Sequence, residues 1–200
     1  MRVFGKSFDE KRDYLAKKAG EVFFEKGYKE SSLYDVAKKG KISKAGIYHY
    51  FKAKEDILAH ILLTNTKTGV EALNKCIDEC ERNGLPQEEA IKNQVRVYAR
   101  FLLGNRKTSM LVLRERHQLT GKNKAKLLKM EREIFEIFRS QLEKIPDLNN
   151  IYDPSAASFL LIAMNHWMGY WFKESGRCSR ETLVNQNIDL VFNGLMKKGG

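Results

Sequence analysis

Apolar residues recur every three or four positions along most of the chain, which is the spacing of a helix with one buried face. Only three prolines occur, and no segment alternates apolar and polar residues as a half-buried strand does. The sequence therefore predicts an all-α fold. The helices expected from this spacing cover residues 7–27, 33–39, 44–51, 55–82, 86–104, 107–119, 124–144, 155–172 and 181–197.

Two short helices near the N-terminus carry helix-start signals. Ser32 with Asp35 forms a capping-box pattern, as Ser7 with Glu10 does for the first helix. Gly40 interrupts the pattern, and Ser43 is placed to cap a second short helix. Two short helices joined by a glycine-containing turn are typical of a helix-turn-helix, whose second helix enters the major groove of DNA.

Charge supports the same interpretation. The segment from Val36 to Lys54 holds six lysines and no acidic residue, interleaved with aromatic residues, and the whole chain has a formal net charge of +11. Such a segment is costly to bury and well suited to a phosphate backbone. Each lysine taken alone is also compatible with a merely solvated position. Ile47, Tyr50 and Phe51 are expected to face inward and attach the second short helix to the first helix.

The segment "FFEKGYKESSLYDVAKKGKISKAGIYHYFKAKEDIL" closely resembles the DNA-binding domain of the TetR/AcrR family of bacterial transcriptional regulators. One departure is Lys39-Gly40 followed by Lys41, where the family usually has an alanine-glycine pair. The resemblance implies a three-helix DNA-binding helix-turn-helix domain at residues 1–54. It also implies a larger helical ligand-binding and dimerisation domain at residues 55–200.

The resemblance places the helix from Lys44 to Tyr50 in the major groove and lets Lys54 clamp a phosphate. Lys44 can donate to guanine or phosphate, and small residues after it allow close approach of the backbone. The expected DNA-binding residues are Ser31, Ser32, Ser43, Lys44, Ala45, Gly46, Tyr48, His49, Tyr50 and Lys54. One such unit reads few base pairs, so a dimer is expected on an inverted repeat, with recognition helices about 34–36 Å apart.

The segment 155–172 is apolar nearly all round, and the last helix has a widened apolar face. A helix of this kind is buried on more than one side. We therefore expect the last two helices to contact both the core and a second copy of the chain, forming a homodimer.

The C-terminal half resembles the sensor domains of TetR-type regulators that respond to acyl-CoA thioesters, through its "RER" helix and its asparagine-tryptophan cluster. The resemblance implies a repressor released by such an effector; the alternative is a regulator of drug efflux that senses lipophilic or aromatic compounds. Arg114, with Arg116, Lys122, Lys124 and Lys126, has the charge to meet CoA phosphates. The candidate ligand-binding residues are Arg114, Asn165, Trp167, Met168, Tyr170 and Trp171. Core packing or dimer contact for Trp167 and Trp171, and ordinary surface charge for Arg114, remain open alternatives.

Other classes of protein lack support. The chain has no glycine-rich phosphate loop, nucleophile elbow or metal-ligand spacing, so neither catalytic residues nor a metal or cofactor is expected. Cys76 and Cys80 lie four residues apart and are expected to be buried free thiols. The apolar runs are too short to span a membrane and none resembles a signal peptide, so a cytoplasmic location is expected. A ligand-independent architectural DNA-binding protein remains a rival within the DNA-binding class.

Overall fold

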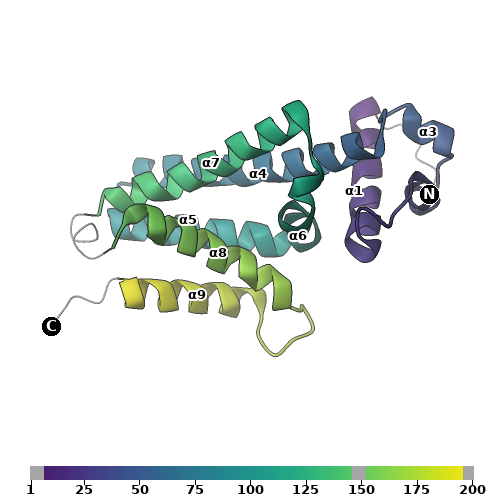
Figure 1. The fold of residues 1–200 in the computed structure, drawn as a ribbon. Helices are drawn as coiled ribbons and strands as arrows, with labels where there is room; N and C mark the ends of the chain where they lie inside the picture. Colours follow the sequence, from purple (N-terminus) through teal and green to yellow (C-terminus); the bar gives the residue numbers. More distant parts are fainter. Residues whose placement is uncertain (1–6, 146–151, 196–200) are drawn as a thin grey trace. The chain divides into compact units, whose positions relative to one another are not determined.

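The structure is a computed structural model that describes residues 7–145 and 152–195, and all regular structure within these residues is helical (Figure 1). The predicted all-α class is confirmed. The helices are α1 Phe8–Lys26, α2 Leu33–Gly40, α3 Lys44–Tyr48, α4 Lys54–Arg82, α5 Gln87–Gly104, α6 Arg106–Glu115, a 3-10 turn Arg116–Gln118, α7 Gly121–Glu143, α8 Pro154–Trp171 and α9 Arg180–Leu195.

Most expected helix bounds differ from these by only a few residues. Helix α3 ends at Tyr48 rather than at residue 51, because the amides of Tyr50 and Phe51 both donate to the carbonyl of Ile47 and tighten the last turn. The helix expected at 107–119 is α6 followed by the 3-10 turn. The expected end of the last helix at residue 197 lies outside the described residues.

The first compact unit contains Met1–Asn65 and Lys107–Leu127. Its core joins Leu15 and Phe23 of α1 to Leu58 and Leu62 of α4, and it includes Leu111 of α6. This unit extends past the boundary expected at residue 54, because the first three turns of α4 bury their apolar side chains in the same core as α1. As a statement about functional domains, the division into 1–54 and 55–200 stays a prediction.

Both predicted capping boxes form. The hydroxyl of Ser7 accepts from the amide of Glu10, and the hydroxyl of Ser32 accepts from the amide of Asp35. The Lys26 ammonium and the Ser32 groups around Asp35 lower the pKa of that carboxyl. The start of α2 is therefore held both by its own cap and by an ion pair to α1.

The turn after α2 differs from the expectation in one respect. Gly40 is the last helical residue, and Lys41 takes the left-handed conformation at φ 54°. A Cβ on residue 40 would lie 3.0 Å from Leu15 Cδ2, so the glycine permits α2 to approach α1 closely. The glycine is thus explained by packing, while a lysine occupies the position that normally favours glycine.

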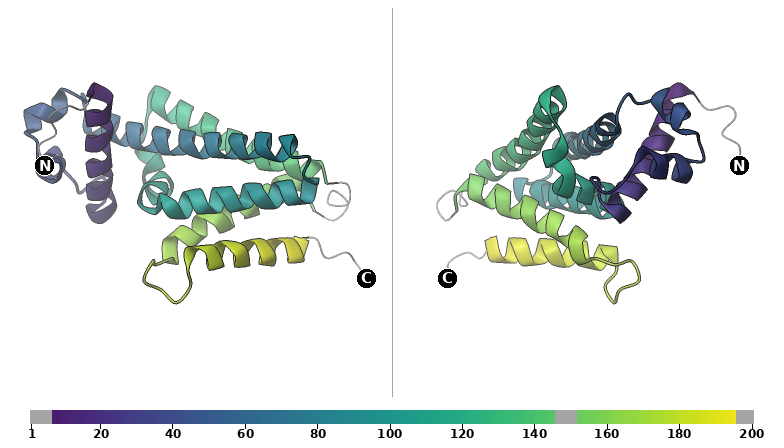
Figure 2. Two further views of the ribbon diagram at one scale, coloured as in Figure 1. Left: turned by 180° about the vertical axis from the view of Figure 1, so that it is seen from behind. Right: turned by 45° about the vertical axis from the view of Figure 1, so that its right-hand side comes forward.

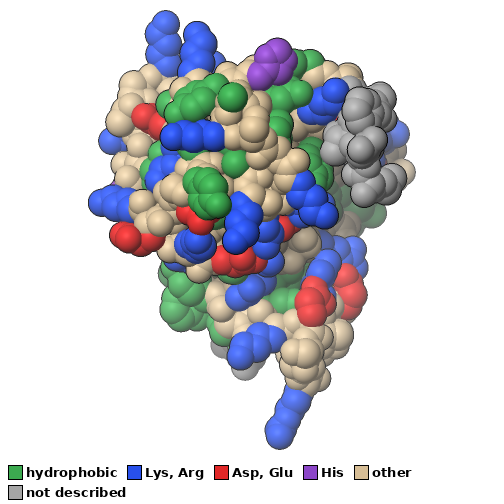
Figure 3. All heavy atoms as spheres, turned by 90° about the vertical axis from the view of Figure 1, so that its right-hand side faces the viewer, with side chains coloured by type: hydrophobic (Ala, Val, Ile, Leu, Met, Phe, Trp, Pro, Cys, Tyr) green, Lys and Arg blue, Asp and Glu red, His purple; other side chains and the backbone are tan. Residues whose placement is uncertain are grey.

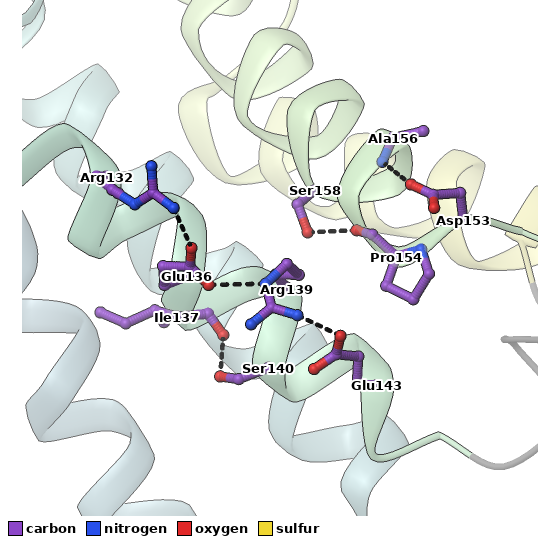
Figure 4. A network of polar contacts seen from close by, with 10 residues as sticks. All are labelled: Arg132, Glu136, Ile137, Arg139, Ser140, Glu143, Asp153, Pro154, Ala156 and Ser158. Atoms are coloured by element: carbon purple, nitrogen blue, oxygen red, sulfur yellow. Dashed lines mark hydrogen bonds and ion pairs between the residues drawn. The ribbon is translucent and has the colours of Figure 1, made fainter.

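The second compact unit contains Thr66–Arg106 and Leu128–Gly200. Helices α8 and α9 lie side by side (Figure 2), and both pack against α5. The core includes Leu73, Val95, Phe138, Leu161 and Val184, contributed by all five of its helical segments. Asp153 caps α8 by accepting from the amide of Ala156 at 2.7 Å (Figure 4).

Two further expectations concern the cysteines of α4 and the length of apolar helix that a membrane span requires. Cys76 and Cys80 are buried free thiols, as predicted, with their sulfur atoms 4.0 Å apart. Burial raises the pKa of Cys76 to about 12, so this thiol stays protonated at neutral pH. Among the described helices, none is long and apolar enough to cross a membrane.

Candidate functional site

Helix α3 presents a short exposed face on a buried anchor. Ser43 caps it by accepting from the amide of Gly46 at 3.0 Å, and Ile47 is completely buried in the first unit's core. Lys44, Ala45 and Tyr48 are exposed. The helix is therefore fixed from below by one apolar residue while its other side is free to meet a ligand.

The aromatic residues after α3 form a cluster with the start of α1. The ring of Phe8 lies 5.6 Å from His49 and 4.9 Å from Tyr50, measured between centroids. His49 is exposed, whereas Tyr50 is only partly exposed and contacts the core. Phe8 was not predicted as part of this site. The only signal in the sequence was that it directly follows Ser7, the N-cap of α1.

Local packing explains why position 46 is a glycine. A Cβ on residue 46 would lie 2.6 Å from Ile42 Cγ1, which is closer than any real contact allows. The glycine lets α3 fold back against the residue that precedes its cap. Close approach of the backbone to DNA remains a separate prediction.

Cationic side chains surround α3. Lys38, Lys41 and Lys44 are exposed and form no ion pair within the described part of the chain. Lys39, by contrast, lies 3.6 Å from Glu21 and 3.5 Å from Glu25 and ties α2 to α1. Figure 3 faces the side where α1 and α3 are labelled in Figure 1, and Lys and Arg side chains are spread over it. The same face also carries Asp and Glu side chains (Figure 3), so the cations placed to attract a polyanion are those that form no ion pair among the described residues, Lys38, Lys41 and Lys44.

Ser31 and Ser32 have different surroundings. Ser31 is buried, and its hydroxyl donates to the carbonyl of Tyr28 at 2.7 Å. Ser32 is exposed at the N-terminus of α2, where its own backbone amide donates to the Asp35 carboxylate. Of the two predicted phosphate contacts, only Ser32 has an accessible side chain in this structure.

Lys54, expected to clamp a phosphate, is turned toward the protein. Its ammonium donates to the carbonyls of Tyr28 and Ser31, each at 2.7 Å, and lies 3.4 Å from that of Lys29. It also lies 4.3 Å from the centre of the Tyr28 ring. An ammonium has three donors, so these three carbonyls occupy all of them. Lys54 therefore fixes the loop between α1 and α2, and burial lowers its pKa.

Glu115, at the end of α6, holds the same loop from another side. Its side chain is buried, and its Oε1 accepts from the amide of Tyr28 at 3.4 Å. Glu55 accepts from the amide and hydroxyl of Thr120 at 3.0 and 2.9 Å. These carboxylates were not predicted, because their partners are distant in sequence.

A groove of about 490 Å³ in the first unit brings together cations whose proximity the sequence did not predict. Arg12, Lys52, His60 and Lys126 line it. The Arg12 guanidinium lies 5.1 Å from the centre of the Phe51 ring, and His60 Nε2 is 2.7 Å from Asp13 Oδ1. Their positions in four separate segments gave no local pattern.

The predicted ligand-binding residues of α8 do not face the same way. Asn165 and Met168 are buried, whereas Trp167, Tyr170 and Trp171 are about half exposed or more. Trp167 and Tyr170 contact each other, with centroids 5.0 Å apart. One pocket inside this unit therefore cannot be lined by all five.

Arg114 belongs to the first compact unit, whereas the α8 candidates belong to the second. Its guanidinium lies 5.8 Å from the centre of the Phe24 ring. It lines a groove of about 340 Å³ with Tyr28 and Glu115. Its predicted role in ligand binding remains a prediction. No group of three or more His, Cys, Asp or Glu side chains among the described residues is placed to hold a metal ion.

A buried anchor beneath an exposed, cationic second helix defines a helix-turn-helix protein of the DNA-binding class. Comparison with protein families agrees. Residues 15–61 match the family model of bacterial regulatory proteins, tetR family, and residues 84–195 match the tetracyclin repressor-like C-terminal domain. The chain belongs to the TetR family of transcriptional regulators. No curated protein matches the chain.

Solved structures of this family superpose on most of the chain. The TetR family regulator PfmR from Thermus thermophilus is 27% identical, with 90% of this chain and 98% of that chain covered and a TM-score of 0.81. AibR, in complex with isovaleryl coenzyme A and operator DNA, is 20% identical, with 91% and 98% covered and a TM-score of 0.81. The ketosteroid regulator KstR2 of Mycobacterium tuberculosis is 15% identical, with 98% and 100% covered and a TM-score of 0.81. At under 25% identity, the last two establish the fold alone.

Proposed function

We propose that the protein is a dimeric repressor that binds an inverted-repeat operator through α3 and is released by a small effector. The observation that carries the DNA-binding part is the exposed face of α3, with Lys44, Tyr48 and His49 outside and Ile47 buried beneath them. Lysine can donate to guanine or phosphate, and an aromatic ring can touch thymine methyl groups.

The exposed face of α8 supports the dimer. Its exposed large apolar residues are Phe159, Leu160, Trp167, Tyr170 and Trp171, whereas Leu190 is the one exposed large apolar residue in the described part of α9. Contiguous apolar patches of this kind mark interaction surfaces. We therefore propose that α8 supplies most of the apolar contact and α9 mainly polar contacts.

The effector belongs to the second unit in this proposal. An acyl-CoA thioester is the favoured class, supported by the structural likeness to AibR, whose complex holds isovaleryl coenzyme A. The alternative is a lipophilic or aromatic compound, with drug efflux as the regulated activity. Native mass spectrometry of protein from its own host separates them, since a bound CoA adduct has a distinct mass.

An operator selected from a random duplex library provides the DNA test. Lys44→Ala and Tyr48→Ala are expected to weaken operator binding about tenfold or more, at unchanged thermal stability. Lys75→Ala, a change at an exposed position of α4, is the control and should bind the operator normally. The affinity of the wild-type protein for operator DNA should fall steeply as the salt concentration rises. Normal binding by both α3 variants, or a flat salt response, contradicts the proposal.

Trp167→Glu tests the dimer separately. A buried, unpaired carboxylate at the centre of an apolar contact is costly, so the variant is expected to sediment as a monomer and to lose cooperative operator binding. Leu190→Glu should weaken the dimer less. A Trp167→Glu protein that remains a dimer at micromolar concentration argues against α8 as the contact.

A further inference from the structure

The interior of the second unit contains polar side chains, and those that are buried in its described part are all uncharged. They are Thr66, Gln94, Gln141, Ser158, Asn165 and Asn187. Their surroundings are the apolar core of α4, α5, α7, α8 and α9. Each such group must find a hydrogen-bond partner or else lower the stability of the fold.

Some of these groups are satisfied and others are not. Ser158 donates to the carbonyl of Pro154 at 2.6 Å, and Gln141 Oε1 accepts from Gln87 at 2.8 Å. Gln94 is completely buried, yet neither its Oε1 nor its Nε2 has a partner. Asn165 is also completely buried; its amide nitrogen donates to the carbonyl of Leu161 at 2.7 Å, and its Oδ1 has no partner.

Gln94 and Asn165 lie on α5 and α8, which pack against each other, whereas two further buried residues with an unpaired side-chain atom, Thr66 and Asn187, lie on α4 and α9. The hydroxyl of Tyr98 on α5 lies 2.9 Å from Nε2 of His166 on α8, so these two residues mark where the helices meet. Gln94 is one turn before Tyr98 on the same side of α5, and Asn165 is the neighbour of His166. His166 Nδ1 is buried and has no partner either.

The two ionisable side chains that meet between α5 and α8, Tyr98 and His166, are uncharged at neutral pH. Burial lowers the pKa of His166 to about 4 and raises the pKa of Tyr98. The carboxylate of Glu131 also raises the pKa of Tyr98, after burial. On α7, Arg132 pairs with Glu136, and Arg139 with Glu136 and Glu143 (Figure 4), while Lys129 is exposed. Arg106 already donates to the carbonyls of Gly169 and Tyr170 on α8, and Gln94, Asn165 and His166 offer a ligand carboxylate no positive charge.

We propose that the part of the effector that enters this unit is apolar and places an uncharged hydrogen-bonding group between α5 and α8, against Gln94, Asn165 and His166. This inference rests on the proposed function, because it describes the effector of the same regulator. Asn165 Oδ1 and Gln94 Oε1 require a donor, and Gln94 Nε2 requires an acceptor. An amide or a hydroxyl meets both needs, whereas an ionised carboxylate only accepts.

The test uses the full-length protein without DNA and three probes of equal chain length: octanamide, 1-octanol and octanoate at pH 7.5, repeated with six- and ten-carbon chains. Both tryptophans of the chain, Trp167 and Trp171, lie on α8, so their fluorescence reports binding beside the site. We expect the amide and the alcohol to bind and to raise the thermal midpoint. Octanoate is expected to bind about tenfold more weakly or worse, since it leaves buried groups unpaired.

Variants assign the binding to these residues. Gln94→Leu and Asn165→Leu are expected to weaken octanamide binding about tenfold. Gln141→Leu, which alters a buried amide that already has a partner, should keep it. Circular dichroism and operator binding show which variants are folded. If Asn165→Leu does not fold, Gln94→Leu and the comparison of octanamide with octanoate still test whether a neutral group binds at these residues.

Three results overturn the proposal: carboxylates that bind as well as amides, no binding by any neutral probe, or wild-type binding by both leucine variants. If no neutral probe binds and the leucine variants are more stable than the wild type, water alone fills the site. Operator binding is measured separately, so a regulator that binds DNA but none of these probes refutes this inference and leaves the DNA-binding proposal standing.

Discussion

Buried polar side chains are treated differently in the two compact units. In the first unit Ser31, Ser109 and Glu115 each have a hydrogen-bond partner. In the second unit Gln94 and Asn165 are more deeply buried and keep unpaired atoms. Among the described residues of the first unit, only the Nε of the half-buried Arg12 is a buried side-chain atom without a partner, and the unit presents its chemistry outward on α3. The second holds unpaired polar atoms on completely buried side chains, and the proposed effector contact rests on these atoms.

The largest expected effect is on the loop that Lys54 fixes. Lys54→Met removes a cation from three carbonyls while keeping most of the side-chain length, so we expect the free energy of unfolding to fall by about 3 kcal/mol. Operator affinity should fall too, because Ser32 and α2 follow this loop. Urea unfolding measures the first effect, and Lys52→Met, at an exposed position, is the control. A change as small as that of the control would mean that water replaces the ammonium.

The second prediction concerns acid. The folded protein holds His166 with a pKa of about 4, whereas the unfolded chain takes up its proton below about 6.5. Stability from neutral His166 is therefore complete above pH 6.5 and is lost as the pH falls toward 4. The loss at pH 5 is about 2 kcal/mol. Denaturant unfolding from pH 7.5 to 5 should show this slope, and His166→Gln should remove it; equal slopes in both proteins would contradict the assignment.

A matched pair of variants sharpens the comparison between the units directly. Ser31→Ala removes a satisfied hydrogen bond and should cost about 1 kcal/mol. Gln94→Leu removes unpaired polar atoms and should cost less than that or even stabilise the protein, since no partner is lost. Thermal unfolding of both variants gives the ranking. The reverse order would show that Gln94 is satisfied in solution.

The smallest effect is expected at the turn before α3. Lys41 takes the left-handed conformation, in which a side chain costs about 1 kcal/mol. Lys41→Gly should raise stability by about 0.5 kcal/mol, net of the glycine's greater chain entropy. It also removes an exposed cation, so Lys41→Asn, which tolerates this conformation, serves as the comparison. A stability loss in both variants would show that the lysine side chain itself holds the turn.

Local patterns in the sequence predicted the helices, both capping boxes and the exposed face of α3. These features depend on residues three or four positions apart, within one turn of helix. Ser7 with Glu10 and Ser32 with Asp35 needed no knowledge of the rest of the chain. The family followed from the same short segment, because its motif is contiguous.

The tertiary structure alone decided which groups face each other. Helix α8 is apolar nearly all round, so its periodicity indicated no direction, and the fold turned Asn165 inward and Trp167 outward. Lys54 found its carbonyl partners more than twenty residues away, in the loop before α2. Periodicity is a property of one helix, whereas a partner for a buried polar group depends on which helices meet and at what depth.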